Sequence, residues 1–398
     1  MRDRRDILRA AGGAALLAAG GRALANPPTV DLGFAGGTRE LVAYPGKRPL
    51  IRLTTRPPQL ETPLQLLGRA ITPNDAFFVR YSLSDAPPAG LDGAAHRLTV
   101  GGAVAKPLSL SVAGLKKLPA TEITAVLQCS GNSRGFSEPR VSGGQLGHGA
   151  MGNARWRGVP LKALLERAGV KAGAKAVSFD GSDQPPVEGM PDFVKGIEID
   201  HVLDGEVMVA YAMNGADLPI LNGFPLRLVV PGYYGTYWIK HLSAITVLDA
   251  PFDGYFNKTA YRIPDNDCAC VPPGAKPDKT RPIGRYNVRS FLTSLGDGAK
   301  VAAGDVAVSG IAFDGGSGIA RVELSADGGR RWQPATLGAD LGRYSFREWQ
   351  GRVTIAAGAH VLMARATARS GEMQPLTAIW NPAGYMRNVV ETVRVVAA

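Results

Sequence analysis

The chain has 398 residues, of which 45% are hydrophobic and 20% charged, a balance typical of folded proteins and not of disordered ones. Its 50 glycines and 29 prolines favour short strands and tight turns over helical bundles, and three cysteines are too few for a scaffold held by disulfides. Five arginines and two aspartates in residues 1–25 contribute +3 to the formal net charge of +11, which leaves +8 on the rest of the chain.

Residues 1–25 resemble a twin-arginine export signal. Arg4 and Arg5 precede an uncharged stretch, residues 10–21, that is rich in Ala, Gly and Leu, and Ala23-Leu24-Ala25 reads as a cleavage site. The apolar stretch is shorter than the roughly 20 residues that span a bilayer. An ordinary secretory signal with two arginines is the alternative. Either signal predicts a soluble periplasmic protein without a membrane span, and export argues against a nucleic-acid partner in spite of the positive charge.

Residues 26–265 predict a first domain in which strands and short helices are mixed. Residues 26–60 have weak periodicity and suggest an extended arm. The predicted elements are a strand at 97–100, a helix capped by Ser111 that runs to Lys117, a helix at 161–168 ended by Gly169, and buried strands at 206–213 and 225–230.

A second domain follows a connection at residues 266–283, which is rich in Pro, Asp and Lys. Hairpin-type turn signals at 314–316 and 327–329 separate alternating segments. About seven short strands in residues 284–398 predict an immunoglobulin-like sandwich, so the fold class of the whole chain is α+β. Cys268 and Cys270 lie in the connection, and their spacing argues against a direct disulfide; a structural or incidental role is expected for both.

Cys129 stands in the segment VLQCSGNSRGF, residues 126–136. A strand-like run ends in a polar, glycine-containing turn, a geometry that exposes a sulfur as a nucleophile or a metal ligand, and Arg134 would favour a thiolate or a bound anion. Two alternatives remain at this point. The cysteine could be a buried apolar side chain, or it could be a catalytic nucleophile, although none of the five histidines has an obvious pairing context.

This segment resembles the Q-C-[AS]-G-N-x-R motif of the sulfite oxidase family. The resemblance continues in order through TPNDAFFVR (72–80), GAMGNARW (149–156), AYAMNG (210–215), NGFPLR (222–227), VPGYYGTYWIK (230–240) and WNPAGY (380–385). It covers essentially the whole chain after the export signal. Within the family it is nearest to the catalytic subunits of bacterial periplasmic sulfite dehydrogenases, and the C-terminal domain resembles the family's dimerisation domain.

The resemblance implies a molybdenum centre held by molybdopterin, a pyranopterin dithiolene, with Cys129 as the only protein ligand of the metal. It implies Arg80 and Arg134 as the arginines that bind sulfite, and Tyr261 as the active-site tyrosine. Sulfur from a thiolate suits a redox metal, and the planar guanidinium pairs well with oxyanions. Positions matching the cofactor-binding loops are Phe78, Arg80, Cys129, Asp183, Asn222, Arg227, Trp238, Ile239 and Lys240.

One position departs from the family pattern. The family places a histidine two residues after the first arginine, in F-x-R-x-H, whereas this chain has Ser82. A short hydroxyl replaces a titratable ring. We therefore expect metal binding to be retained, with weaker sulfite binding or slower turnover than a histidine would support.

The predicted function is oxidation of sulfite to sulfate in the periplasm. No C-x-x-C-H motif is present, so the chain should carry no haem of its own and its electrons should pass to a cytochrome c, either a subunit or a soluble protein. The C-terminal domain would pair with a second copy of the chain, or a cytochrome subunit would be the partner in place of that copy. The alternatives are a molybdoenzyme that acts on another sulfur oxyanion or a sulfoxide, and an exported binding module without redox activity.

Overall fold

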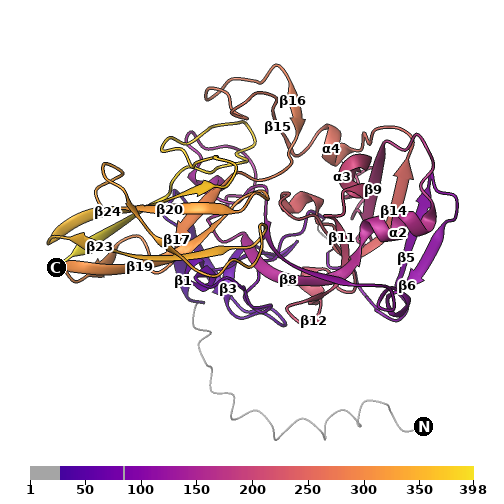
Figure 1. The fold of residues 1–398 in the computed structure, drawn as a ribbon, viewed down its shortest axis with the longest axis horizontal. Helices are drawn as coiled ribbons and strands as arrows, with labels where there is room; N and C mark the ends of the chain where they lie inside the picture. Colours follow the sequence, from indigo (N-terminus) through magenta and orange to yellow (C-terminus); the bar gives the residue numbers. More distant parts are fainter. Residues whose placement is uncertain (1–26, 84–85) are drawn as a thin grey trace, which may run out of the picture.

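The computed structural model describes residues 27–83 and 86–398, so the predicted export signal at 1–25 lies outside the described residues. The described chain is mostly β with four short α-helices, which agrees loosely with the predicted α+β class. Figure 1 shows the strands gathered into two lobes, with the C-terminal strands β19, β20, β23 and β24 on one side and β5, β6, β9 and β14 on the other. No helix among the described residues has the length and hydropathy needed to cross a membrane.

The described residues begin with a small antiparallel sheet, where the sequence analysis predicted an extended arm at residues 26–60. Its four strands pair in sequence order: β1 (Thr29–Asp31), β2 (Thr38–Val42), β3 (Leu50–Thr54) and β4 (Gln59–Glu61). Leu50 and Leu60 are buried against Val79 and Tyr81. This packing gives the short strands an apolar face that their weak periodicity did not indicate, and η1 (Leu64–Leu67) follows them.

Two groups of five strands each follow in the N-terminal half. One sheet has the order β10-β9-β14-β5-β6 and contains the parallel pair β14·β5. Its strands are β5 (Arg97–Gly102), β6 (Leu108–Ser111), β9 (Ala176–Gly181), β10 (Lys195–Glu198) and β14 (Leu242–Leu248). The second has the order β12-β11-β8-β7, with β13 also paired to β11, and consists of β7 (Thr121–Gln128), β8 (Met151–Pro160), β11 (Met208–Met213), β12 (Ala216–Asp217) and β13 (Arg227–Val229). The strands predicted at 97–100, 206–213 and 225–230 are therefore confirmed as β5, β11 and β13.

The two predicted helices are present, but the first ends at Leu115, two residues before the predicted Lys117. The Ser111 side chain accepts a hydrogen bond from the Gly114 amide at the start of α1 (Val112–Leu115). Gly169, with a φ of 69°, ends α2 (Leu161–Ala168), because a left-handed residue closes the last turn without a Cβ clash. The remaining helical elements are α3 (Ile199–Leu203), α4 (Tyr255–Lys258), η2 (Arg134–Phe136), η3 (Ile220–Asn222) and η4 (Gly235–Tyr237).

Residues 266–283 contain a disulfide that the sequence analysis argued against. Cys268 and Cys270 are bonded, with their Cα atoms 5.1 Å apart, a separation that lies within the usual range. Ala269 adopts a left-handed conformation (φ 51°), and the Asn266 side chain accepts a hydrogen bond from the Cys270 amide. This turn brings the two sulfur atoms together. The argument from the single intervening residue did not take such a turn into account. Nearby, β15 (Arg262–Pro264) pairs with β16 (Thr280–Pro282).

The C-terminal half consists of two sheets, as predicted for a sandwich. The first has the order β17-β19-β23-β22 and the second β18-β25-β24-β20-β21. Their bounds are β17 (Arg289–Leu292), β18 (Ala299–Val301), β19 (Gly304–Phe313), β20 (Ile319–Ser325), β21 (Gln333–Pro334), β22 (Thr336–Leu337), β23 (Arg347–Ile355), β24 (Gly358–Ala368) and β25 (Thr392–Ala397). Side chains of both sheets share one core, which includes Val308, Val322, Val353 and Leu362. The immunoglobulin-like description itself stays a prediction.

Candidate molybdenum-cofactor site

Cys129 follows directly on β7, whose last four residues are buried. Its amide donates to Ala150 O, and the Asn132 side chain accepts from the Ala150 amide, so the loop is tied at two points to the residue that precedes β8. Ser133 takes a left-handed conformation (φ 68°) that turns the chain into η2. With the other two cysteines bonded to each other, Cys129 is the only free thiol among the described residues, and it is half-buried.

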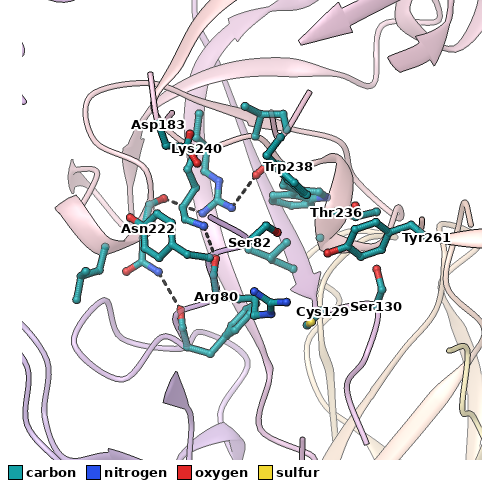
Figure 2. A pocket seen from close by; sticks show the side chains of 18 residues that line it. Arg80, Ser82, Cys129, Ser130, Asp183, Asn222, Thr236, Trp238, Lys240 and Tyr261 are labelled. Atoms are coloured by element: carbon teal, nitrogen blue, oxygen red, sulfur yellow. Dashed lines mark hydrogen bonds between the residues drawn. The ribbon is translucent and has the colours of Figure 1, made fainter. Parts of the chain in front are cut away.

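Cys129 borders a cavity. Every predicted site residue except Arg134 lines it: Phe78, Arg80, Ser82, Cys129, Asp183, Asn222, Arg227, Trp238, Ile239, Lys240 and Tyr261. Figure 2 shows Arg80 directed toward Cys129 and Tyr261, with Lys240 and Asp183 at the opposite side of the cavity. Segments that lie far apart in the chain thus meet in one site.

Seven lining residues were missed by the sequence analysis: Tyr81, Leu127, Ser130, Phe193, Leu221, Gly235 and Thr236. Ser130 and Thr236 fall inside segments that matched the family, so their hydroxyls could have been proposed from the motif. Phe193 and Leu221 lie outside those segments, and no signal in the sequence pointed to them.

The cavity is lined by three cations, Arg80, Arg227 and Lys240, and by one carboxylate, that of Asp183. Burial, reinforced by the charge of Arg227, lowers the pKa of Lys240 to about 7. Burial likewise lowers the pKa of Arg227 to about 9 and raises that of Asp183, which Lys240 opposes. Because desolvation and like charges both disfavour the protonated bases, an anion in the cavity would restore their positive charge.

Several polar atoms in the wall are buried without a protein partner. They are Arg80 Nη1, Arg227 Nε, Ser130 Oγ and Thr236 Oγ1, which have no hydrogen-bond partner within residues 27–83 and 86–398. An unsatisfied buried donor is costly, and native proteins rarely keep one that no ligand uses. An anionic group with many acceptor atoms, such as a phosphate-bearing pterin, would satisfy these donors. The residues present therefore fit the molybdenum cofactor.

Arg227 is held in place by the loops around it. It donates to Asn222 O (2.7 Å) and to Trp238 O (3.2 Å), and its guanidinium lies 5.3 Å from the Trp156 ring centroid. The Asn222 amide is itself occupied, since it accepts from Lys47 Nζ (2.6 Å) and donates to Phe78 O (3.0 Å). Asn222 thus shapes the wall of the cavity, and its backbone oxygen orients Arg227.

Tyr261 lies at the edge of the cavity in a left-handed conformation (φ 56°). Its ring stacks on Tyr385 of the C-terminal half at a centroid distance of 5.8 Å. Lys195, which is fully buried, holds its ammonium 5.4 Å from the same ring. Figure 2 shows the Tyr261 hydroxyl directed into the cavity. Stacking on one side and a cation on another fix a ring whose hydroxyl can hold or move a proton.

Arg134, predicted to bind sulfite, is not among the residues that line the cavity. Its Nε donates to Ala383 O (2.8 Å) and its Nη1 to Gly144 O (3.3 Å). The guanidinium lies 4.9 Å from the Tyr385 ring centroid. In this arrangement the side chain connects the Cys129 loop to the C-terminal half.

A buried charged cluster lies behind the Cys129 loop. His148 stacks on Phe136 at 4.2 Å, and its Nδ1 lies 2.7 Å from Ser133 Oγ and 4.0 Å from Glu391. Burial lowers the pKa of His148 to about 4, although Glu391 opposes this and Arg289 adds to it. Burial alone would raise the pKa of Glu391, but the cations around it lower that pKa to about 2. At neutral pH the imidazole is therefore neutral and the carboxylate charged.

The neutral state of His148 predicts a dependence of stability on pH. Between pH 6.5 and about 4 the unfolded chain binds a proton here that the folded chain does not, so the free energy of unfolding falls as the pH drops through this window. The difference is about 3 kcal/mol. Urea unfolding at pH 7 and pH 4.5 should show a smaller loss in His148→Gln than in the wild type.

The wild type and His148→Gln must be compared because the titration of Glu61 changes the free energy of unfolding in the opposite direction. Burial raises the pKa of Glu61 to about 7, so its contribution to stability grows as the pH falls through the same range. The His148→Gln variant keeps Glu61, and the difference between wild type and variant isolates the imidazole. Equal pH slopes in both would contradict a neutral, buried His148.

Two family models match the chain: the oxidoreductase molybdopterin binding domain at residues 85–256 and the Mo-co oxidoreductase dimerisation domain at residues 280–397. Sulfite oxidase of Gallus gallus is 34% identical over 361 residues, which are 86% of this chain and 77% of that protein. Mitochondrial sulfite oxidase of Homo sapiens is 34% identical over 371 residues, 88% of this chain and 66% of that protein. The crystal structure of the sulfane dehydrogenase SoxCD from Paracoccus pantotrophus is 27% identical with a TM-score of 0.74 and covers 89% of this chain and 87% of that one. The chain therefore belongs to the sulfite oxidase family of molybdopterin-dependent oxidoreductases.

Proposed function

We propose that the protein is a periplasmic sulfite dehydrogenase that oxidises sulfite to sulfate and passes the electrons to a c-type cytochrome. The observation that carries the proposal is the free thiol of Cys129 at one side of a cavity whose cations and buried polar atoms lack partners in the described chain. The identity with sulfite oxidases over most of the chain supports sulfite as the substrate.

Five side chains of the cavity have a defined task in this proposal. Molybdenum in its pterin would supply a two-electron redox centre bound by the Cys129 thiolate. Arg227 and Lys240 would hold the anionic part of the cofactor. Arg80, whose Nη1 has no partner among the residues described, would bind the sulfite oxyanion. The Tyr261 hydroxyl would move a proton at the reacting oxygen.

Oxidation of another sulfur compound is the second candidate function. The likeness to a sulfane dehydrogenase over nearly the whole of both chains favours it. Ser82 also leaves this chain without the ring that the family's sulfite site usually contains. The two candidates share the metal and the cavity, and they differ only in the substrate that Arg80 would bind.

The experiment that tests the proposal combines metal analysis with kinetics. The protein is expressed with its full N-terminus in a host that makes molybdopterin, and the exported fraction is purified. About one molybdenum per chain and sulfite-dependent reduction of cytochrome c are expected. Molybdenum with activity only on a persulfide substrate would support the second candidate. Protein without molybdenum would overturn the enzyme assignment and leave the exported binding module.

Ser82 offers a prediction about the quality of the sulfite site. The side chain lines the cavity and is half-buried, so a histidine placed there would supply a titratable donor beside Arg80. We expect Ser82→His to raise kcat/KM for sulfite about ten-fold, less than the roughly 100-fold that general acid–base groups typically contribute. Steady-state kinetics at pH 7 measure the effect.

Ser82→Asn is the control, since it adds bulk and hydrogen-bonding groups without a group that titrates. Its kcat/KM should stay near the wild-type value. If Ser82→His had the wild-type kcat and KM for sulfite, Ser82 would not limit the activity of this enzyme.

A further inference from the structure

The C-terminal half contacts the loop that follows Cys129 at three neighbouring residues, Ser133, Arg134 and Phe136. Arg289 Nη2 donates to Ser133 Oγ (2.9 Å), and Arg387 Nη1 donates to Phe136 O (3.1 Å). Arg134 Nε donates in the other direction, to Ala383 O (2.8 Å). These contacts all fall on the turn that follows Cys129, and they come from β17 and from the segment before β25.

Two of these contacts depend on a single carboxylate. Glu391 accepts from Arg289 (3.1 Å) and from both Nε and Nη2 of Arg387 (3.0 and 2.9 Å). The side chain of Arg289 is only 1% exposed and that of Glu391 13%. Buried ions need their partners, because removing one leaves an uncompensated charge in a poorly solvated place. Glu391 therefore stabilises both arginines at the positions from which they contact the loop.

Ser133 is the point at which the cluster holds the loop. It is fully buried and adopts a left-handed conformation, which a residue with a Cβ takes only when its surroundings require it. Arg289 Nη2 donates to the Ser133 oxygen, and the same oxygen lies 2.7 Å from His148 Nδ1. The hydroxyl is thus held by two side chains.

The position of Ser133 is passed on to Cys129 through short backbone links. Asn132 donates its amide to Cys129 O (3.0 Å), and Ser133 donates its amide to Gly147 O (2.7 Å). A loop closed in this way cannot shift at Ser133 without moving the sulfur four residues earlier. A metal ligand must be held within a fraction of an ångström of its productive geometry.

We infer that Glu391, Arg289 and Ser133 form a positioning device through which the C-terminal half sets the orientation of the Cys129 thiolate toward the metal. The inference rests on the proposed function, in which Cys129 binds molybdenum. None of the three residues lines the cavity, so they would act through the loop. The C-terminal half thus has a part in the chemistry in addition to any role in dimerisation.

The test uses the full-length holoenzyme and two variants of different severity. Ser133→Ala removes one oxygen and keeps a Cβ at the left-handed position, and Arg289→Met removes the buried cation. Both should lower kcat about ten-fold or more with a much smaller change in KM, as expected for a misplaced reacting group. Both should also shift the electron paramagnetic resonance spectrum of the one-electron-reduced metal, which reports the orientation of its sulfur ligand.

Glu206→Gln is the matched control. Glu206 also joins the two halves, through Arg285 (2.6 Å) and Arg343 (2.7 Å), but it makes no contact with the Cys129 loop. It should lower the melting temperature without changing the resonance spectrum or kcat. Variants that lose stability and keep the wild-type spectrum would overturn the inference alone, whereas wild-type protein without molybdenum would overturn the proposed function with it.

Discussion

Replacement of Cys129 by serine is expected to lower kcat for sulfite oxidation by more than about 1,000-fold, the scale seen when a residue essential to a catalytic unit is removed. A thiolate is a soft, strongly donating ligand, whereas a serine hydroxyl is harder and stays protonated at neutral pH. The cofactor itself should be retained, because Arg227 and Lys240 contact the cavity independently of the sulfur. Steady-state kinetics and metal analysis on the same preparation measure both effects.

The other two cysteines provide the control. Cys268 and Cys270 are bonded to each other in the exposed connection between the halves, and the double serine variant should keep the wild-type kcat. A Cys129→Ser enzyme with wild-type kcat would exclude the thiolate as the functional metal ligand. Loss of all molybdenum in that variant would show that the sulfur, and not the cations, holds the cofactor.

Two helix ends could be predicted from the sequence because they depend only on residues that are close together in the chain. Gly169 ends α2 and Ser111 caps α1 because these effects need only one turn of helix. The family motif placed nearly all of the proposed residues around one cavity, since collinear segments bring their tertiary arrangement with them. The order of the motifs along the chain thus pointed to the residues of the cavity, which no single residue type would have done.

The sequence was less informative where a side chain's partners come from distant segments. The family resemblance implied that Arg134 binds sulfite, which stays a prediction; the contact of its Nε with Ala383 O could not be read from the sequence. The role of Glu391 was also invisible, because its partner Arg289 lies 102 residues away in sequence and the loop is contacted only by the arginines that Glu391 binds. Charged residues without a motif become interpretable only when their burial is known.

The charge of the cavity would allow one chain to hold a cofactor and, as proposed, an oxyanion together. The cations lie on different sides, with Arg80 directed toward Cys129 and Lys240 beside Asp183 (Figure 2). Lys240 also donates to the backbone oxygen of Arg80, so occupation of the cofactor end helps to fix the arginine at the substrate end. Binding of the cofactor should therefore precede formation of a competent sulfite site.

Arg80→Gln is the direct test of that substrate end, and we expect it to raise KM for sulfite about 100-fold with a smaller change in kcat. Arg80 Nη1 is buried and has no hydrogen-bond partner in the described part of the chain. A hydrogen bond to a charged group contributes about 1.5–3 kcal/mol, and each 1.4 kcal/mol is a factor of about ten in affinity. Initial rates over a wide range of sulfite concentrations give both constants.

Two further variants make the result specific. Arg80→Lys keeps the charge and loses the planar fork, so its KM should lie between those of the wild type and Arg80→Gln. Arg48→Gln removes the same charge at a position paired with Asp75 (2.8 Å) and outside the cavity, and its KM should not change. A KM that rises equally in Arg80→Gln and Arg48→Gln would mean that the net charge of the protein attracts sulfite. An elevated KM in the Arg80 variants alone would place the oxyanion against this guanidinium.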